Sequence, residues 1–306
     1  MNAPRRTWQR VDGVLLLDKP TGLSSNAALQ RARRAFNAEK AGHTGTLDPL
    51  ASGLLPLCFG EATKFAQFLL DATKAYTATV RFGVTTDTLD AEGRVLETRP
   101  VALDRAEVAA ALGAFTGTQL QRPPAFSALK HQGRPLYAYA RKGEDVPREP
   151  REVTIERVAL RDWRPPDAIV DVVCSKGTYV RVLAADLGAA LGCGAHLAGL
   201  VRTATGGFSL ADAVGLAALE GLEAPLRMQR LLPVSILVQH LPRLDLEAGA
   251  AAAFLHGQPV PAGPALEGTV AVFQGESLLG VAEAGQGMAR PRRVLAAEAV
   301  GPGEAG

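Results

Sequence analysis

Cysteine is scarce in this 306-residue sequence, and long hydrophobic runs are missing. Only three cysteines occur, none with a partner at short spacing: Cys58, Cys174 and Cys193. Disulfide-stapled domains and zinc ribbons need closely spaced cysteine pairs, so both classes are excluded. The cysteine content therefore predicts a protein of a reducing compartment.

The apolar segments are too short or too interrupted for a signal peptide or a membrane span. The stretch Val14–Leu17 ends at Asp18, whereas a signal-peptide core has about 7 to 15 apolar residues. The longer segment 182–201 is interrupted by Asp186 and His196, whereas a membrane helix needs about 20 apolar residues. We therefore expect a cytoplasmic protein without a membrane partner.

Three common cofactor and metal motifs are also absent. No Gly-Lys-Ser/Thr occurs at the spacing of a phosphate-binding loop, and no Gly-x-Gly-x-x-Gly joins a predicted strand to a helix. The five histidines are scattered and lack the i, i+4 spacing of a helical metal site. We therefore expect chemistry that uses no cofactor and no metal.

The net charge is close to zero, but the basic residues are unevenly distributed. A formal charge of +2, taken alone, argues against a strong nucleic-acid binder. Residues 1–42, however, contain eight Lys or Arg against three Asp or Glu, and residues 122–151 contain seven against three. These two basic segments either contact phosphates or simply keep surface helices solvated.

Hydrophobic periodicity and turn residues predict alternating strands and helices, with a change to short β-like pieces after residue 241. A serine cap at Ser24 or Ser25 is expected to start the first helix. Residues 41–56 are expected to form a loop, and residues 121–151 a basic inserted subdomain. Further helices are expected at 61–70, 104–112 and 179–191, and strands at 11–17, 76–82, 153–160, 169–174, 268–273 and 277–282.

Asp48 is the most conspicuous candidate for chemistry because its neighbours in the sequence are mostly apolar. A carboxylate that packs inward among such residues needs a cationic partner, or its pKa must rise. The alternative is a structural role, in which Asp48 caps a helix that starts at Pro49. Arg181 presents a similar choice. A cation at the start of a helix opposes the helix dipole, so Arg181 either serves another group or is a surface arginine.

Four further residues have both a structural and a nucleic-acid interpretation. Tyr76 begins a strand and Tyr179 precedes a helix, so each is either a core aromatic or a ring that stacks on an extruded base. His43 is either a solvated loop histidine or a residue that stacks on or inserts into nucleic acid. Leu200, by its own chemistry, is an apolar packing residue.

Five separated motifs connect these residues. They are GVLLLDKP (13–20), AGHTGTLDPLASGLLP (41–56), GEATK (60–64), SALK (127–130) and CSKGTYVR (174–181). Together, and in this order, they closely resemble the bacterial TruB family, the tRNA pseudouridine-55 synthases. The match extends over about residues 11–298, and five ordered motifs are far more specific than any one of them.

The resemblance implies an α+β pseudouridine-synthase fold. This fold has a mixed, largely antiparallel sheet with flanking helices, an inserted thumb-like segment and a small, β-rich C-terminal domain similar to PUA RNA-binding domains. On this chain it implies a catalytic domain at 1–240, with the basic insertion at about 121–151. The PUA-like domain would span 241–298, and residues 299–306 would form a disordered tail.

The resemblance also implies an enzyme that extrudes uridine 55 from the T arm of tRNA and isomerises it to pseudouridine. Asp48 matches the family's essential aspartate, which acts either as a nucleophile at C6 or C1′ or as a base at C2′. Arg181 matches the arginine that pairs with this aspartate, and Tyr76 matches the tyrosine that stacks on the target base. The implied partner is the tRNA T-arm stem-loop, bound by a monomer without a protein partner or cofactor.

Further residues match contacts with the RNA or support for the catalytic loop. His43 matches the histidine that enters the T loop, and Tyr179 and Leu200 match contacts with the extruded nucleotide. Lys19, with Pro20, matches a motif that supports the catalytic loop. Phosphates of the T arm are expected to bind the basic residues Arg31, Arg33, Arg34, Lys130, Arg134, Arg141 and Arg148.

Two other functions fit parts of the sequence. A tRNA-binding or folding module would need the same basic segments but no catalysis. A carboxylate-dependent glycosidase would need a second acid at a suitable distance, and no second carboxylate stands out near Asp48 in the sequence.

Overall fold

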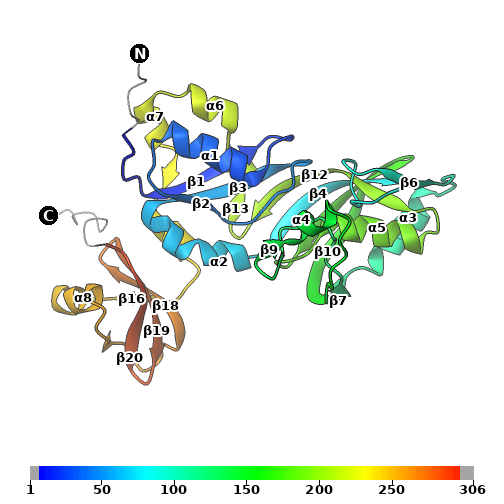
Figure 1. Cartoon of the computed structure of the whole chain (residues 1–306). Helices are drawn as coiled ribbons and strands as arrows, with labels where there is room; N and C mark the ends of the chain where they lie inside the picture. Colours follow the sequence, from blue (N-terminus) through cyan, green and yellow to red (C-terminus); the bar gives the residue numbers. More distant parts are fainter. Residues whose placement is uncertain (1–6, 297–306) are drawn as a thin grey trace, which may run out of the picture.

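The computed structural model describes residues 7–296, which form one large sheet with flanking helices and a second, smaller sheet (Figure 1). The strands of the large sheet are β1 (Gly13–Lys19), β2 (Ala41–His43), β3 (Ala51–Phe59), β4 (Lys74–Phe82), β7 (Gly117–Gln121), β10 (Arg151–Arg164), β11 (Asp167–Cys174), β12 (Ala195–Thr205), β13 (Phe208–Ser209), β14 (Val214–Gly215) and β15 (Leu231–Leu232). A separate pair is β5 (Val84–Thr86) with β6 (Val95–Thr98).

The helices of this part of the chain are short. They are α1 (Ser25–Ala35), α2 (Ala66–Asp71), α3 (Arg105–Gly113), α5 (Val180–Ala190), α6 (Leu216–Gly221) and α7 (Ala224–Met228), with 3₁₀ turns η1 (Gly60–Phe65), η2 (Leu210–Asp212) and η3 (Val234–Leu237). In the described residues, no helix is both long and apolar enough to cross a membrane.

The large sheet is mixed and largely antiparallel, which confirms the predicted fold class. Its main path is β14-β1-β3-β12-β4-β11-β10-β7, and only the β1–β14 and β3–β12 pairs along it are parallel. The predicted strand pair 153–160 and 169–174 is confirmed as β10 and β11. β12 lies between β3 and β4, so residues far apart in the sequence meet at the centre of the sheet.

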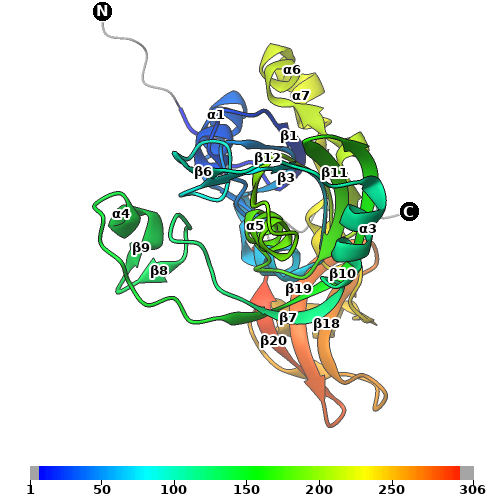
Figure 2. The ribbon, with the colours of Figure 1, turned by 90° about the vertical axis from the view of Figure 1, so that its right-hand side faces the viewer.

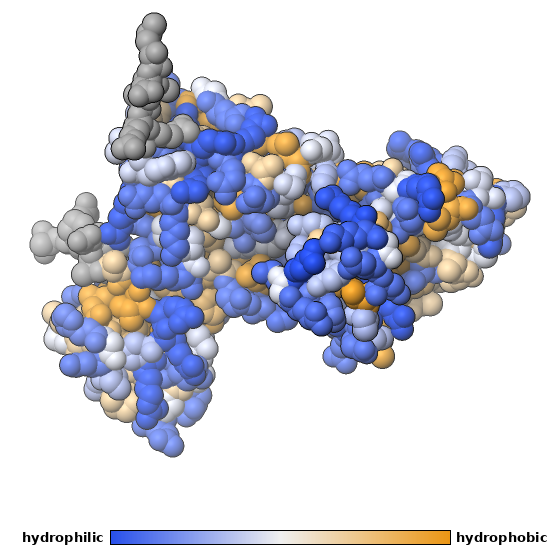
Figure 3. All heavy atoms as spheres, in the orientation of Figure 1, coloured by the Kyte–Doolittle hydropathy of each residue, from blue (hydrophilic) through white to orange (hydrophobic). Residues whose placement is uncertain are grey.

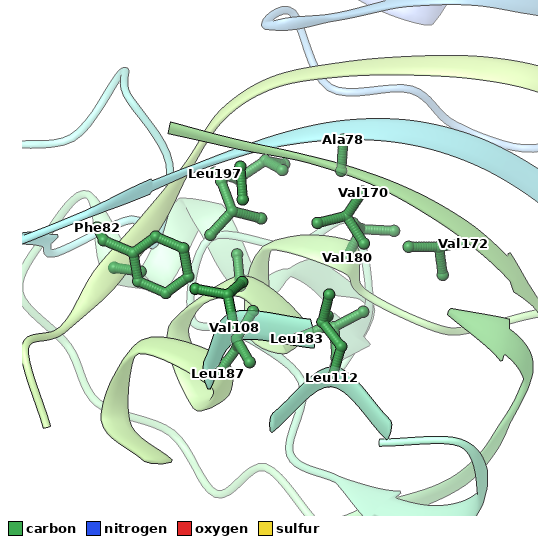
Figure 4. Packing of buried hydrophobic residues seen from close by; sticks show 14 of the residues in the cluster. Ala78, Phe82, Val108, Leu112, Val170, Val172, Val180, Leu183, Leu187 and Leu197 are labelled. Atoms are coloured by element: carbon green, nitrogen blue, oxygen red, sulfur yellow. The ribbon is translucent and has the colours of Figure 1, made fainter. Parts of the chain in front are cut away.

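Alternating side chains explain how the sheet is covered. β11 buries every second residue, including Val170 and Val172, and the helix α5 contributes Leu183 and Leu187 to the same cluster (Figure 4). Burying such a side chain contributes roughly 1.5–3 kcal/mol relative to leaving it exposed. A second cluster packs α1 and α6 against β1 and β3.

The predicted helix caps are confirmed, whereas the loop predicted at 41–56 is not. Ser24 caps α1 by accepting a hydrogen bond from the backbone N–H of Ala27, and Asp104 and Glu107 form the predicted capping box. The expected loop at 41–56 is wrong at both ends, because it contains β2 and the start of β3. Its Gly and Pro residues mimic a loop, but β3 pairs on both edges and is almost entirely buried. The expected helix at 61–70 is η1 followed by α2.

Residues between β7 and β10 stand away from the sheet (Figure 2). This insertion contains the hairpin β8 (Lys130–His131) and β9 (Arg134–Pro135), followed by helix α4 (Leu136–Ala140). The structure therefore places a separate basic element beside the main body, where the composition changes in the sequence.

The C-terminal part of the chain forms its own five-stranded sheet. The strands of this sheet are β16 (Arg243–Asp245), β17 (Val260–Pro261), β18 (Gly268–Gln274), β19 (Ser277–Gly285) and β20 (Met288–Val294), and the helix α8 (Ala248–Leu255) lies between β16 and β17 in the sequence. A third cluster joins it to the main body, with Phe65 on one side and Phe273 and Leu278 on the other. The β-rich C-terminal domain is confirmed, its limits at 241 and 298 stay predictions, and the expected tail at 299–306 lies outside the described residues.

Candidate active site

Asp48 lies in a turn between β2 and β3, not at the start of a helix. The backbone N–H of Ala51 donates to the Asp48 carbonyl (3.0 Å), and the chain then enters β3. The helix-cap interpretation is therefore wrong. The neighbouring residue Leu47 is held by the buried Ser25 at the start of α1, which accepts from the Leu47 N–H (2.7 Å) and donates to its carbonyl (2.9 Å). The turn is thus fixed next to the carboxylate.

Arg181 is a buried cation that joins two carboxylates. Its Nη2 lies 2.9 Å from Oδ2 of Asp48, and its Nη1 lies 3.3 Å from Oδ2 of Asp90. The Arg181 side chain is 6% exposed, so it is not a surface arginine. Its position near the start of α5 is unfavourable to the helix dipole, and the two carboxylates compensate for this.

Asp90 was missed by the sequence reasoning, which expected no second carboxylate near Asp48. It lies in the polar connection after β5, and Thr88 and the Glu92 N–H donate to its Oδ1 (2.6 and 3.1 Å). The Asp90 side chain is 5% exposed, compared with 42% for Asp48. No local pattern marks Asp90, because its neighbours in the sequence are those of an ordinary polar turn.

The groups around Asp48 have opposing effects on the pKa of its carboxyl group. Burial raises the pKa of its carboxyl group above the ordinary value, and the nearby Asp90 raises it further. Arg181 and, more weakly, Lys19 lower this pKa, but the net direction is upward. The ion pair therefore limits an increase in pKa that burial alone would make larger.

Two cavities adjoin Asp48 and Arg181, and both residues line both cavities. The first, of about 400 Å³, also has Tyr76, Tyr179, Leu200 and Arg202 in its wall. Gln121, at the end of β7, holds the backbone of Tyr179. The side-chain amide of Gln121 accepts from the Tyr179 N–H (2.7 Å) and donates to the Tyr179 carbonyl (3.1 Å). The structure thus brings five predicted site residues, from distant segments of the chain, to one cavity: Asp48, Tyr76, Tyr179, Arg181 and Leu200.

The second cavity, of about 660 Å³, is more polar and includes His43, Asp90, Tyr137 and Arg141 in its wall. His43 is at the end of β2, opposite Leu57 of β3, and is half-buried, so it is not a solvated loop residue. Its Nδ1 is buried without a hydrogen-bond partner. Burial and the nearby Arg202 lower its pKa, which favours the neutral imidazole.

The two predicted lysines lie in different surroundings. Lys19 is fully buried, and its ammonium group donates to the carbonyls of Pro20 (2.9 Å) and Leu23 (2.7 Å), just before α1. Burial lowers the pKa of Lys19 to about 8. Lys130, by contrast, is exposed on the β8–β9 hairpin and lines neither cavity.

The expected phosphate-binding residues separate into two groups. Arg31 pairs with Glu220, and Arg33 donates to the carbonyls of Ala38 (2.9 Å) and Glu39 (2.7 Å), so both already have partners in the protein. In the insertion, Arg134 lies over the ring of Tyr139 and Arg141 over the ring of Tyr137. The surface over α4 and its hairpin is strongly hydrophilic (Figure 3).

Among residues 7–296, no group of three or more His, Cys, Asp or Glu side chains is placed to hold a metal ion. Arg202, which is fully buried in the wall of the first cavity, was also missed from the sequence. It lies two residues after Leu200 in a strand of apolar pattern, where nothing local separates a site residue from a surface residue.

Comparisons with known proteins give a consistent result. Family models for the TruB family pseudouridylate synthase N-terminal domain, the tRNA pseudouridylate synthase B C-terminal domain and the pseudouridine synthase II TruB C-terminal region match residues 33–180, 181–239 and 242–295. The tRNA pseudouridine synthase B of Thiobacillus denitrificans is 57% identical, over 94% of this chain and 97% of that protein. The enzyme of the same name from Chromobacterium violaceum is 54% identical, over 98% and 99%.

A chain in the crystal structure of a Cbf5–Nop10–Gar1 complex has the same fold. It matches with a TM-score of 0.74 and 26% identity, over 97% of this chain and 92% of that one. The family models together account for most of the sequence, and the two curated relatives match it from end to end. The chain belongs to the TruB family of pseudouridylate synthases.

Proposed function

We propose that this protein converts uridine 55 in the T arm of tRNA to pseudouridine, with Asp48 as the essential carboxylate. The family makes the chain a pseudouridine synthase, and the names of its relatives supply tRNA as the substrate. The observation that carries the site assignment is the ion pair between Asp48 and the buried Arg181, which lines both cavities.

The reaction breaks the N1–C1′ bond of uridine and forms a C5–C1′ bond. The C5 hydrogen leaves as a proton and N1 gains one, so no atoms are added or lost overall. Asp48 can serve as a nucleophile at C6 or C1′, or as a base at C2′ of the ribose. In each route the carboxylate must be ionised and fixed in position, and its contact with Arg181 supports both requirements.

The first cavity is the proposed site of the extruded base. In this arrangement the uracil ring stacks on Tyr76, while Tyr179 and Leu200 close the remaining wall. Extruding a base costs a few kcal/mol, and stacking on an aromatic ring returns roughly 1–3 kcal/mol per base. His43 lines the second cavity together with Asp48, which supports the proposal that it occupies the space left by extruded T-loop bases.

The basic insertion is the proposed contact for T-arm phosphates. Arg141 lines the second cavity, and Arg134 and Lys130 lie on the neighbouring hairpin. Arg31 and Arg33 are weaker candidates than the sequence alone suggested, because each already has acceptors within the protein. The phosphate contacts are therefore assigned mainly to the insertion.

The proposal is tested by tritium release from a T-arm stem-loop that carries [5-³H]uridine. The wild-type protein should release tritium from uridine 55 and none when that uridine alone is replaced. Asp48→Asn should bind the same RNA and release nothing, because an amide is neither a nucleophile nor a base at this site. Binding without release by the wild type would favour the tRNA-binding or folding module. Turnover by Asp48→Asn would exclude the catalytic assignment.

The proposal also places the enzyme in the cytoplasm and treats it as a monomer on tRNA. Mass measured by light scattering during gel filtration, with and without a T-arm stem-loop, tests the second point. One protein per RNA is the expected stoichiometry. A stable dimer in the absence of RNA would contradict it.

A further inference from the structure

We infer that Arg202 is a positioning residue that holds the Asp48 turn and the Tyr76 ring in their places in the first cavity. The inference rests on the proposed role of Asp48. Arg202 lies on β12, and its side chain is 1% exposed. It is opposite Gly53 of β3 on one side and Tyr76 of β4 on the other. The strand that leaves the catalytic turn and the strand that carries the stacking ring therefore meet at this residue.

The guanidinium group of Arg202 binds both ends of the catalytic turn, the segment 45–54, which comprises the turn around Asp48 and the first four residues of β3. Its Nε donates to the carbonyl of Leu54 (2.6 Å), and its Nη2 donates to the carbonyl of Gly45 (3.3 Å). Asp48 lies between these two acceptors in the chain. Since a planar guanidinium presents several donors in fixed directions, one side chain can set the separation of the two ends of the turn.

The glycines of the turn fit closely around Arg202. A Cβ atom at Gly53 would lie 2.4 Å from the carbonyl oxygen of Arg202, and φ at Gly53 is +97°. A Cβ atom at Gly45, where φ is +120°, would lie 3.5 Å from Nη1 of Arg202. The turn therefore lies directly against this arginine, at a distance that a larger residue at position 53 would prevent.

Arg202 also acts on two other side chains of the site. Its positive charge lowers the pKa of the Tyr76 hydroxyl, against the larger rise due to burial. It also lowers the pKa of His43. Through its hydrogen bonds to the turn and its position opposite Tyr76 in the strand pairing, Arg202 links the carboxylate to the ring that receives the base.

A purely structural role does not require a charge at this position. Among the described residues, no carboxylate lies within ion-pair distance of Arg202, and its acceptors on the turn are backbone carbonyls. A buried cation without a counter-charge is costly, and well-packed apolar side chains often replace even a buried ion pair without loss of stability. An arginine at this position is explained if its several N–H donors fix the geometry of the catalytic turn.

The test compares Arg202→Met, Arg202→Lys and Tyr76→Phe with the matched control Arg227→Met. Arg227 also donates to backbone carbonyls, those of Leu219, Leu222 and Ala35, but it lies away from both cavities. Melting temperature, the Kd for a T-arm stem-loop and the single-turnover rate of tritium release at saturating RNA are measured for each protein.

For Arg202→Met we expect the single-turnover rate to fall about 100-fold, as for a displacement of about 1 Å at a reacting group, with an unchanged Kd. Arg202→Lys should recover part of the rate, because one ammonium group cannot hold both ends of the turn. Arg227→Met should lower the melting temperature and leave the rate unchanged. In a Tyr76→Phe background, Arg202→Met should lower the rate less than in the wild type, because the interaction of the Arg202 charge with the Tyr76 hydroxyl is already absent.

Several outcomes would overturn the inference. They are a wild-type rate in Arg202→Met, a loss confined to Kd, or an equal loss of rate in Arg227→Met. If Arg202→Met does not fold, Arg202→Lys tests the inference instead. A wild-type rate in Arg202→Lys would show that the several N–H donors of arginine are not needed. Absence of tritium release by the wild type, or turnover by Asp48→Asn, would instead overturn the proposed function on which the inference rests.

Discussion

Replacing Arg181 by methionine removes the cation that the buried Asp90 and the more exposed Asp48 share. The Arg181–Asp90 pair is deeply buried, with side chains 6% and 5% exposed, whereas Asp48 is 42% exposed and better solvated. Removing one partner of a buried pair typically costs about 3–5 kcal/mol, compared with about 1 kcal/mol or less for an exposed pair. We expect a loss near the lower limit, about 3 kcal/mol, which corresponds to a fall of roughly 6–12 °C in Tm.

The loss of stability in Arg181→Met should increase with pH. The pKa of Asp48 is already raised, and Arg181 is the main group that lowers it, so the substitution raises this pKa further. The folded variant then keeps a proton on Asp48 at pH values where the unfolded chain has released it. Its stability therefore falls as pH rises from the ordinary carboxyl pKa through the raised one. The deficit should be larger at pH 8 than at pH 5, and the acidic limb of the pH–rate profile should move to higher pH.

Thermal unfolding at pH 5 and pH 8, together with single-turnover tritium release across pH, measures both effects. Asp90→Asn in the Arg181→Met background should restore part of the melting temperature, because it removes the uncompensated charge. Arg81→Met is the matched control, since it breaks the exposed Arg81–Asp167 pair on β4 and β11. Equal melting temperatures for Arg181→Met and Arg81→Met, or an acidic limb that does not move, would refute this account of the site.

Two further predictions concern the backbone of the turn and the RNA surface. Gly53→Ala should destabilise the protein by about 1–3 kcal/mol as an overpacked site, because its Cβ would overlap the Arg202 carbonyl. Gly143→Ala, where φ is also positive but space is open, is the control in thermal melting, and equal losses would contradict the clash. Arg141→Gln should reduce the salt dependence of T-arm binding by about one unit in the log–log slope. Arg31→Gln should change this slope less, because Arg31 is already paired with Glu220. Both slopes are measured by anisotropy titrations across KCl concentrations, and a larger change in Arg31→Gln than in Arg141→Gln would reassign the phosphate contact.

The sequence by itself determined most local structure and the family. Ser24 caps α1, and Asp104 with Glu107 caps α3, because capping depends on side chains within one turn of the chain. The strand pair predicted at 153–160 and 169–174 is likewise confirmed as β10 and β11. The five ordered motifs, one of which contains Asp48 and another Arg181, were sufficient to predict the family that the comparisons then showed. The roles of these residues in catalysis stay predictions.

Only the tertiary structure decided which groups surround Asp48. The expected loop at 41–56 proved to contain β2 and the start of β3, because pairing with β1 and β12 buries a segment whose glycines and prolines look like a loop. Asp90 and Arg202 come from an ordinary polar turn and an ordinary strand, 42 and 154 residues along the chain from Asp48. Their burial arises from contacts between distant segments, which local patterns do not encode. The raised pKa of Asp48, caused by its own burial and by the nearby Asp90, arises in the same way.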